Sequence, residues 1–238
     1  MKKFIFDVDG TLTPSRKRID PKFETFFLDF CSNNKVYIVT GSDHPKTLEQ
    51  LGEHILKRVQ VCFNCAGNEV WQNEKIVSKE SWEPSQEIIS YLENLLEKSK
   101  FPIRTGNHIE IRNGMLNFCI PGRNSNGEQR QQYIEWDKST SERLNLIEKI
   151  KNKFGNVIDS YVGGETGIDI FPSGSGKKQV ISKIKTKPSD ILYYFGDQVF
   201  ENGNDYDAAI LCNHYYNVRD WSVVHEMLSY FIEARVCK

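Results

Sequence analysis

Short apolar runs alternate with amphipathic stretches through the first third of the chain. Residues 3–9, 36–40 and 59–63 are apolar runs of strand length, which predicts three buried strands. Between them, residues 20–34 and 45–57 repeat their apolar side chains at helical spacing, and each stretch has a proline near its start. This β-α-β-α-β alternation predicts a parallel sheet with right-handed crossovers.

The pattern changes in the middle of the chain, where strands and helices no longer alternate singly. A hairpin is predicted at 67–81, and helices are predicted at 84–98 and 137–154. Strands are predicted at 109–112, 115–120, 157–162 and 167–171. This grouping predicts a separate α+β unit. From residue 177 the helix–strand rhythm resumes, with a strand at 191–195.

The complete pattern indicates an α/β protein with a parallel-sheet core and an inserted α+β unit. We place the core at residues 1–82 and 174–238 and the insert at 83–173. A chain of 238 residues is long enough for this arrangement. Its 39% hydrophobic and 26% charged residues are ordinary for a globular protein and exclude a fully disordered or fibrous chain.

Charge and hydropathy limit the partners that we expect. With 31 Lys and Arg against 32 Asp and Glu, the formal net charge is -1, so no general basic field attracts nucleic acid or anionic lipid. No stretch approaches the ~20 apolar residues of a membrane span. The apolar run at the N-terminus ends at Asp7, so it is shorter than the apolar region of a signal peptide. We therefore expect a cytoplasmic protein with neither a membrane nor a nucleic-acid partner.

The cysteines are too few for a disulfide scaffold in a chain of this length. They are Cys31, Cys62, Cys65, Cys119, Cys212 and Cys237. Cys62 and Cys65 form a lone C-x-x-C pair, and one such pair does not complete a four-ligand zinc site. We therefore expect reduced, structural thiols.

Polar side chains gather where the predicted core strands end or their connecting loops turn. They are Asp7, Asp9, Thr40, Ser42, Lys177, Asp197 and Asp205. Turn chemistry explains each group taken singly, because Asp and Gly are common where a strand turns. Together they would put several carboxylates, a hydroxyl and an amine at the carboxyl edge of one sheet, which is where open parallel sheets bind ligands.

This combination suits phosphoryl transfer. Carboxylates at such spacing repel each other unless a cation lies among them, and oxygen ligands suit Mg²⁺. The carboxylates that we assign to the metal are Asp7, Asp9, Asp197 and Asp205. Asp7 is also the expected nucleophile, and Asp9 the expected general acid–base. Lys177, together with Thr40 or Ser42, would bind the phosphate and stabilise the transferring phosphoryl group.

The segments that carry these side chains resemble known motifs. Asp7-Val-Asp-Gly-Thr-Leu-Thr13, Thr40, Lys177 and Gly196-Asp197 resemble, in order, the four motifs of the haloacid dehalogenase superfamily of phosphotransferases. The insert resembles the C2-type cap of that superfamily. The resemblance implies a Rossmann-like parallel-sheet core of the haloacid dehalogenase type with an inserted α+β cap.

A second, more specific resemblance runs from Lys3 to about Met227. Arg112-Asn-Gly-Met-Leu-Asn117, Arg123, Arg130 and Asp169-Ile-Phe-Pro172 are similar to segments of the eukaryotic-type phosphomannomutase family. Membership would imply Mg²⁺-dependent interconversion of mannose 6-phosphate and mannose 1-phosphate through an aspartyl-phosphate. It would also imply a hexose 1,6-bisphosphate as intermediate and activator, and a homodimer formed through the cap.

The same resemblance implies roles for side chains of the insert. The arginines that would hold the phosphate not being transferred are Arg112, Arg123 and Arg130. Arg16 would lie near the mouth of the site, Asp169 would contact sugar hydroxyls, and Asn117 would lie close by. A mutase needs such a second anion site because either end of a bisphosphate must face Asp7 in turn.

Two departures from the family pattern keep an alternative open. Gly167 stands where the family usually has a serine, and residues 173–176 replace a more acidic loop before Lys177. A sugar-phosphate phosphatase on the same scaffold is therefore the alternative. A non-catalytic sugar-phosphate-binding protein is disfavoured because the residues expected to carry the chemistry are all present.

Overall fold

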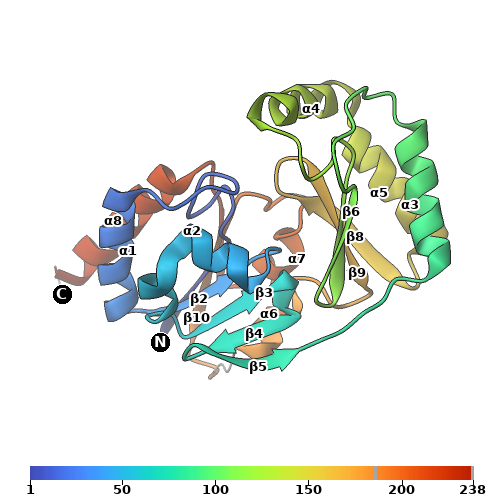
Figure 1. Ribbon diagram of the computed structural model, residues 1–238. Coiled ribbons are helices and arrows are strands. Elements are labelled where there is room, and N and C mark those ends of the chain that lie inside the picture. The colour runs from blue at the N-terminus through green and yellow to red at the C-terminus, as the bar shows by residue number, and fades with distance from the viewer. Residues whose placement is uncertain (185–186, 237–238) are drawn as a thin grey trace.

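The computed structural model describes residues 1–184 and 187–236, which form two sheets (Figure 1). The larger, core sheet has the strand order β11-β10-β1-β2-β3-β4-β5. Its strands are β1 (Lys2–Phe6), β2 (Lys35–Val39), β3 (Val61–Asn64), β4 (Glu69–Gln72), β5 (Lys75–Lys79), β10 (Ile191–Gly196) and β11 (His214–Asn217). The strands from β11 to β3 pair in parallel, which confirms the predicted parallel core.

A hairpin of β4 and β5 extends this sheet with antiparallel pairing. Its turn residues Asn73 and Glu74 have φ values of 50° and 60°. Two successive residues in the left-handed region are typical of the tight turns that match the twist of a hairpin. The hairpin predicted over 67–81 is therefore present, and it belongs to the core sheet.

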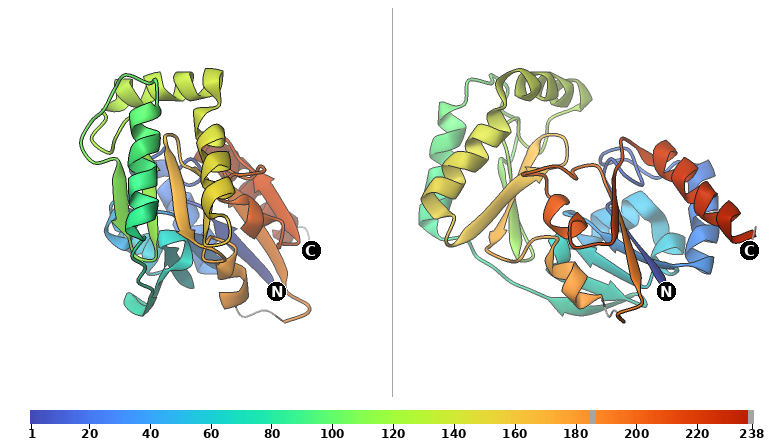
Figure 2. Two further views of the ribbon diagram at one scale, coloured as in Figure 1. Left: turned by 90° about the vertical axis from the view of Figure 1, so that its right-hand side faces the viewer. Right: turned by 180° about the vertical axis from the view of Figure 1, so that it is seen from behind.

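Helices cover both faces of the core sheet (Figure 2). They are α1 (Pro21–Asn33), α2 (His44–Leu56), α6 (Gln179–Lys183), α7 (Tyr206–Ala209) and α8 (Trp221–Val236). Phe4 and Phe6 of β1 pack with α1, α2 and α8, whereas Ile5 packs on the opposite face with α6 and α7. Each of these fully buried side chains stabilises the fold by roughly 1.5–3 kcal/mol.

The smaller sheet is antiparallel, with the strand order β6-β7-β9-β8. Its elements are β6 (Ile109–Arg112), β7 (Met115–Cys119), β8 (Ile158–Gly163), β9 (Gly167–Pro172), α3 (Gln86–Lys98), α4 (Gly127–Thr140) and α5 (Glu142–Phe154). We call residues 83–173 the cap. The fold class of a Rossmann-like core with an α+β insert is confirmed, while the exact domain limits stay a prediction.

The cap sheet has an apolar face and a polar face. Leu116, Phe118 and Ile168 point into the apolar cluster that the sheet forms with the cap helices. Side chains alternate along a strand, so Asn117 and Asp169 of the same strands lie on the opposite face, where they line a cavity. The alternation of apolar and polar residues thus directs functional side chains toward the core.

The prediction of a single helix over 137–154 is wrong, because the chain forms two helices that meet at Ser141. Ser141 has φ 53° and ψ 34°, a left-handed conformation that ends α4. α4 begins well before the predicted start, after a capping box formed by Asn126 and Gln129. Tyr133 is its one buried residue, so apolar spacing provided no signal for this helix.

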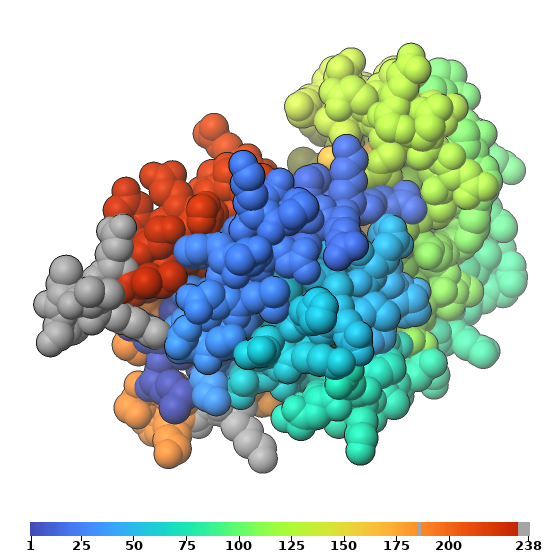
Figure 3. All heavy atoms as spheres, turned by 60° about the vertical axis from the view of Figure 1, so that its left-hand side comes forward, coloured from blue at the N-terminus to red at the C-terminus, as the bar shows by residue number. Residues whose placement is uncertain are grey.

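The cap meets the core at the turn between β6 and β7. Arg112 Nη1 donates to the carbonyl of Gly41 at 2.7 Å, and Asn68 Nδ2 donates to the carbonyl of Gly114 at 3.3 Å. A second set of contacts joins residues 202–204 of the core to β8 of the cap. The space-filling view shows a recess between the two units (Figure 3). The polar face of the cap sheet and the carboxyl edge of the core sheet face each other across this recess.

Two further sequence expectations concern cysteines and membranes. The described cysteines are free and buried: Cys31, Cys62, Cys65, Cys119 and Cys212. Cys237 lies outside the described residues. Burial raises the pKa of the Cys62 and Cys65 thiols, which disfavours the thiolate form that binds metals. Within the described residues, no helix combines the length and apolar character that crossing a bilayer requires.

Candidate active site

Asp7 lies at the carboxyl end of β1, near the middle of the core sheet. Its backbone N–H donates to the carbonyl of Phe195 at 2.9 Å, which continues the strand pairing past β1. The residue is only 4% exposed. Asp7 Oδ1 accepts a hydrogen bond from Lys177 Nζ at 2.6 Å, and the same ammonium donates to Asp205 Oδ1 at 2.8 Å. Two loops distant in the sequence therefore meet at the end of β1.

A third carboxylate completes this group. Among the described residues, Asp7, Asp197 and Asp205 have side-chain oxygens that all lie within 4.8 Å of one another. Glycines make this approach possible, since a Cβ on Gly10 would lie 2.7 Å from Asp197 Oδ2 and one on Gly196 would lie 2.5 Å from Asp205 Oδ2. The glycines of the two motifs are therefore a steric requirement of the carboxylate cluster.

The cluster has more negative than positive charge. Burial raises the pKa of Asp7 well above its ordinary value, and Lys177 offsets part of that effect. Burial, followed by the charge on Asp205, raises the pKa of Asp197 to about 7. Burial alone would lower the pKa of Lys177, but Asp205 and Asp7 outweigh it and keep the amine protonated. A hard divalent cation with oxygen ligands would balance the remaining charge.

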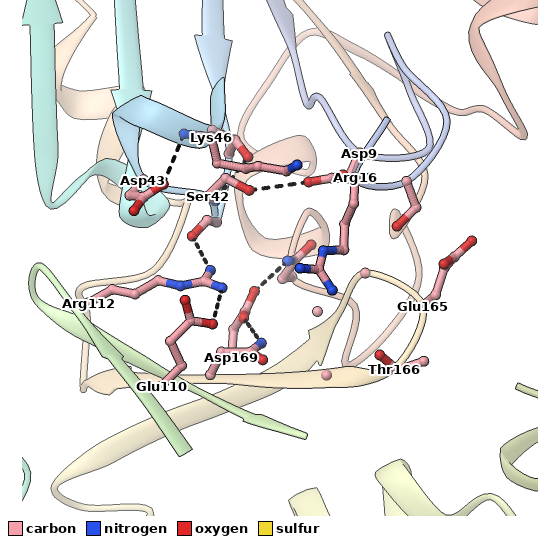
Figure 4. Close-up of a pocket in the computed structure, with 18 of the residues that line it drawn as sticks. Asp9, Arg16, Ser42, Asp43, Lys46, Glu110, Arg112, Glu165, Thr166 and Asp169 are labelled. Atoms are coloured by element: carbon pink, nitrogen blue, oxygen red, sulfur yellow. Dashed lines mark hydrogen bonds and ion pairs between the residues drawn. The ribbon is translucent and has the colours of Figure 1, made fainter. Parts of the chain in front are cut away.

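Asp9 lies outside this cluster, although the sequence assigned it to the metal. Its Oδ1 accepts from the backbone N–H of Arg16 at 2.5 Å and from Gln50 Nε2 at 2.9 Å, and its Oδ2 accepts from Ser42 Oγ at 3.4 Å. These contacts hold the carboxylate at the edge of the cavity (Figure 4). Sequence reasoning missed the fully buried Gln50, because a single glutamine in an amphipathic helix carries no signal.

Thr40 and Ser42 follow β2 and line the same cavity. Thr40 Oγ1 accepts from the backbone N–H of Ser42 at 3.1 Å, which closes the loop into a tight turn. Thr40 is buried, whereas Ser42 is partly exposed toward the cap. The structure therefore brings both hydroxyls to the carboxyl edge of the sheet, beside Asp7 and Lys177.

On the cap side, two amides hold Asp169. Asn117 Nδ2 donates to Asp169 Oδ1 at 2.8 Å, and Asn204 Nδ2 of the core donates to Asp169 Oδ2 at 2.9 Å. Gly163 permits this position, because a Cβ there would lie 2.4 Å from Asp169 Oδ2. Asn204 was not among the predicted site residues, but its place one residue before Asp205 was an available signal.

The predicted arginines of the cap face the cavity, and acidic partners accompany them. Arg112 Nη2 lies 2.9 Å from Glu110 Oε2, and Arg123 Nε lies 2.5 Å from the same oxygen. Arg130 Nη2 pairs with Glu165 at 2.8 Å. Sequence reasoning missed Glu110, although its position two residues before Arg112 on an alternating strand predicts a side chain on the same face.

Arg16 and Lys46 complete the charged lining from the core side. Arg16 has a φ of 60° in the loop after Asp9, and Lys46 comes from the first turn of α2. In the close-up both side chains lie across the cavity from Glu110 and Asp169 (Figure 4). Lys46 was another omission of the sequence analysis, since a lysine near the start of a helix is usually solvated.

All the predicted site residues except Asp205 line one cavity of about 360 Å³ between core and cap. Asp205 is fully buried behind it, where it accepts from Tyr194 Oη at 2.6 Å and from the backbone N–H of Gln198 at 3.1 Å. The buried carboxylate cluster with Lys177 lies at the core end, and three arginines with their acidic partners lie at the cap end. Such a bipolar lining suits a small ligand with a phosphate at each end.

This fold and site define a capped α/β protein with a cluster of carboxylates at the carboxyl end of its central strand. A haloacid dehalogenase-like hydrolase from Bacteroides thetaiotaomicron superposes with a TM-score of 0.54 at 12% identity, covering 91% of this chain and 89% of that one. At this identity the likeness concerns the fold alone. The fold is therefore that of the haloacid dehalogenase superfamily.

Sequence comparison identifies the particular family. The family model of eukaryotic phosphomannomutases matches residues 23–214. Phosphomannomutase 1 of Mus musculus is 32% identical over 212 residues, which are 85% of this chain and 81% of that protein. A phosphomannomutase of Encephalitozoon cuniculi is 33% identical over 211 residues, 86% of this chain and 82% of that protein. The chain belongs to the eukaryotic phosphomannomutase family and is an enzyme, as the resemblance predicted.

Proposed function

We propose that this enzyme interconverts mannose 6-phosphate and mannose 1-phosphate through an aspartyl-phosphate and a hexose 1,6-bisphosphate, with Mg²⁺ as cofactor and the bisphosphate as activator. One observation carries the proposal. A single cavity has a buried carboxylate with its ammonium at one end and three arginines at the other. A phosphatase needs only the first end, whereas a mutase must also hold the phosphate that is not being transferred.

Asp7 is the proposed nucleophile. In one half-reaction a carboxylate oxygen of Asp7 forms a bond to phosphorus while the bond between phosphorus and the departing sugar oxygen breaks. In the other, a sugar hydroxyl oxygen forms a bond to phosphorus while the bond between phosphorus and Asp7 breaks. Asp9 gives a proton to the departing sugar oxygen, and it takes a proton from the sugar hydroxyl that later attacks the aspartyl-phosphate. Lys177, protonated beside Asp7, stabilises the charge on the phosphoryl oxygens.

Three carboxylates would hold the magnesium ion: Asp7, Asp197 and Asp205. Their oxygens fit such an ion because they are hard donors, lie within 4.8 Å of one another and have one ammonium to balance them. When bound, the ion would neutralise charge on the phosphoryl oxygens. We leave the Asp9 side chain out of the ligand set, because it lies outside the group of carboxylates whose oxygens come within 4.8 Å of one another.

The cap arginines are proposed to hold the second phosphate, since guanidinium groups offer paired donors to phosphate oxygens. Asp169, kept in place by Asn117 and Asn204, is proposed to accept hydrogen bonds from sugar hydroxyls. The bisphosphate then turns end for end, so that each phosphate visits Asp7. Enclosure between core and cap protects the aspartyl-phosphate from water.

Phosphorus NMR tests the proposal directly. The enzyme is supplied with mannose 1-phosphate, Mg²⁺ and a trace of glucose 1,6-bisphosphate. We expect mannose 6-phosphate to accumulate at a rate that depends on the bisphosphate. Release of inorganic phosphate without any 6-phosphate would contradict the mutase proposal and favour a phosphatase.

A sugar-phosphate phosphatase on the same scaffold is the second candidate, and Gly167 favours it. A Cβ at Gly167 would lie 2.5 Å from Asn117 Nδ2, so no side chain from this position helps to bind a substrate. The Ser-Gly-Ser-Gly sequence before Lys177 also lacks the acidic residues expected of the family. Fewer contacts to the sugar would weaken retention of the intermediate and favour its hydrolysis.

We further propose that the enzyme is a homodimer formed through the cap and acts in the cytoplasm. β6 is an outer strand of the cap sheet, and its Ile111 is 57% exposed, which supports a partner at this edge. Light scattering of the purified protein is expected to give the mass of two chains. A mass of one chain at micromolar concentration would contradict the dimer.

A further inference from the structure

A carboxylate lies within the proposed second phosphate site. Glu110 and Arg112 are two residues apart on β6, so both side chains lie on the polar face of the cap sheet. One oxygen, Glu110 Oε2, accepts a hydrogen bond from Arg112 Nη2 at 2.9 Å and forms an ion pair with Arg123, whose Nε lies 2.5 Å away. Glu110 therefore occupies a donor group of Arg112 (Figure 4) and balances the charge of Arg123, and both arginines line the cavity.

One further nitrogen of each arginine has a partner within the protein. Arg112 Nη1 donates to the carbonyl of Gly41 at 2.7 Å, and Arg123 Nη1 donates to Asn117 Oδ1 at 3.3 Å. These contacts orient both guanidinium groups without help from a ligand. The side chain of Glu110 is 35% exposed, so it has room to move away from them.

Charge explains why a carboxylate is needed there. Arg123 is partly buried close to two other arginines: burial, then Arg112 and Arg16, destabilise its charged form, and Glu110 counteracts them. A phosphate has more charge and more acceptor oxygens than a carboxylate, and it satisfies several guanidinium donors at once. The same arginines are therefore able to exchange one anion for the other.

We infer that Glu110 is an internal counter-anion that holds the place of the second phosphate and is displaced when that phosphate binds. The inference rests on the proposed function, because it concerns the phosphate gripped by the cap. Glu110 is then a positioning residue that acts through Arg112 and Arg123. Because Glu110 competes for both arginines, it weakens their binding of the second phosphate. The phosphate then dissociates from the cap more easily, and the bisphosphate can turn around.

Sulfate binding tests the inference without any turnover. Sulfate is titrated calorimetrically into the full chain in EDTA, at constant ionic strength. Without metal the carboxylates around Asp7 repel the anion, so the cap site is the one measured. Glu110→Gln is expected to bind sulfate about fivefold or more tightly than the native protein, because the competing carboxylate is gone. Glu128→Gln, at an exposed position on α4 outside the cavity, is the control and should match the native protein.

Equal or weaker sulfate binding by Glu110→Gln would overturn the inference, since Glu110 would then support the arginines rather than compete for them. Sulfate binding that persists in Arg123→Gln would also overturn it, because the anion would lie elsewhere. Thermal unfolding shows whether each variant folds. Glu110→Ala lacks the same carboxylate and provides the same comparison if the glutamine variant does not fold.

Kinetics separate this role from a structural one. In the mutase assay, Glu110→Gln should lower KM for mannose 1-phosphate and also lower kcat, because a tighter grip on the phosphate slows the turn of the bisphosphate. Loss of structure would lower kcat without lowering KM. The two proposals can fail separately. If Glu110→Gln binds sulfate more tightly but the native enzyme only hydrolyses sugar phosphates, the mutase proposal is contradicted, whereas the competition of Glu110 for the arginines is supported.

Discussion

Asp7 and Asp9 are two positions apart, but their surroundings differ and separate their proposed roles. Asp7 ends a central strand, is buried and contacts Lys177 at 2.6 Å. Asp9 lies in the next turn, where Arg16 and Gln50 hold one of its oxygens. A buried carboxylate beside a fixed ammonium suits attack on phosphorus, and a partly exposed carboxylate at the cavity edge suits proton transfer.

Asp7→Asn removes the attacking oxygen with almost no change in size. We expect turnover of mannose 1-phosphate to fall by at least roughly 10³-fold, because an amide does not form the phosphorylated intermediate. Steady-state kinetics measure the loss, and circular dichroism checks the fold. Asp29→Asn, exposed on α1, is the matched control and should keep native turnover. Near-native activity of Asp7→Asn would exclude this carboxylate as the nucleophile.

Arg112 joins the cap to the core and also faces the cavity, so its removal should separate mutase chemistry from simple hydrolysis. We expect Arg112→Ala to lower kcat/KM for mannose 1-phosphate by roughly 10²-fold, because the second phosphate loses a paired donor. Hydrolysis of a small aryl phosphate, which has no second phosphate, should change far less.

Lys149→Ala is the control for this variant, since Lys149 is an exposed cation on α5 outside the cavity. It should leave both activities at native levels. Equal losses of both activities in Arg112→Ala would contradict the assignment of Arg112 to the second phosphate and would indicate a defect in folding instead.

At the scale of elements, the loop that carries Lys177 is flexible by composition but fixed by side-chain amides. Asn68, in the core just before β4, donates to the carbonyl of Ser175 at 3.1 Å, and Gln179 Nε2 donates to the same carbonyl at 2.6 Å. Asn68 also donates to Gly114 in the cap turn. One buried amide therefore links the core, the Lys177 loop and the cap.

Asn68→Leu keeps the number and branching of the non-hydrogen side-chain atoms and removes these hydrogen bonds. We expect the free energy of unfolding to fall by about 1–3 kcal/mol, because buried carbonyl groups lose their donor. Turnover should also fall, since Lys177 loses its fixed position. Urea unfolding and kinetics measure both effects. Gln72→Leu, the same change at an exposed position of β4, should alter neither, and a native-like Asn68→Leu protein would refute the linking role.

At the scale of the whole molecule, apolar clusters stabilise both faces of the core sheet and the interior of the cap, and a smaller cluster joins the two units. Charge collects in the cavity between core and cap. The core side of the cavity concentrates carboxylates around one buried ammonium. Burying like charges opposes folding unless protons or a cation neutralise them. The stability of the folded protein should therefore depend on pH and on Mg²⁺ together.

The sign of that dependence follows from Asp197, whose pKa rises from 3.8 to about 7. Between these values the folded protein binds its proton more tightly than the unfolded chain, so stability without metal should fall as pH rises from about 4 to 7. Mg²⁺ competes with the proton, so its stabilising effect should grow over the same range. At a hundredfold excess over Kd near pH 8, we expect a rise in Tm of about 5–10 °C.

Thermal unfolding in Mg²⁺ and in EDTA, at pH 5 and pH 8, measures this effect. Asp197→Asn should reduce the response to Mg²⁺ and should raise Tm in EDTA at the higher pH. Asp220→Asn, at an exposed carboxylate outside the cluster, is the control and should keep the native response to Mg²⁺. A Mg²⁺ effect that is equal at both pH values would argue against a metal bound by these carboxylates.

Most elements were predictable because their signals are local. The apolar runs at 3–9, 36–40 and 191–195 form adjacent parallel strands in the structure. Continuous apolar runs of this length are typical of strands that are buried on both faces of a sheet. α4 was not predictable from apolar spacing, because one buried tyrosine and a capping box define it. The site residues that follow the core strands were also predictable from the sequence, because glycines and carboxylates are typical of the turns at those positions.

Local sequence patterns specify which side chains stand at each strand end, and the motifs identify the family to which the chain belongs. Which of these side chains come into contact depends on how the core and the cap pack. The tertiary structure joined Asp197 and Asp205 to Asp7 while holding Asp9 aside, and it placed Glu110 between two arginines. The physical reason is that these contacts join residues from separate loops and strands, so packing of the two units sets their distances, which no local pattern of residues contains.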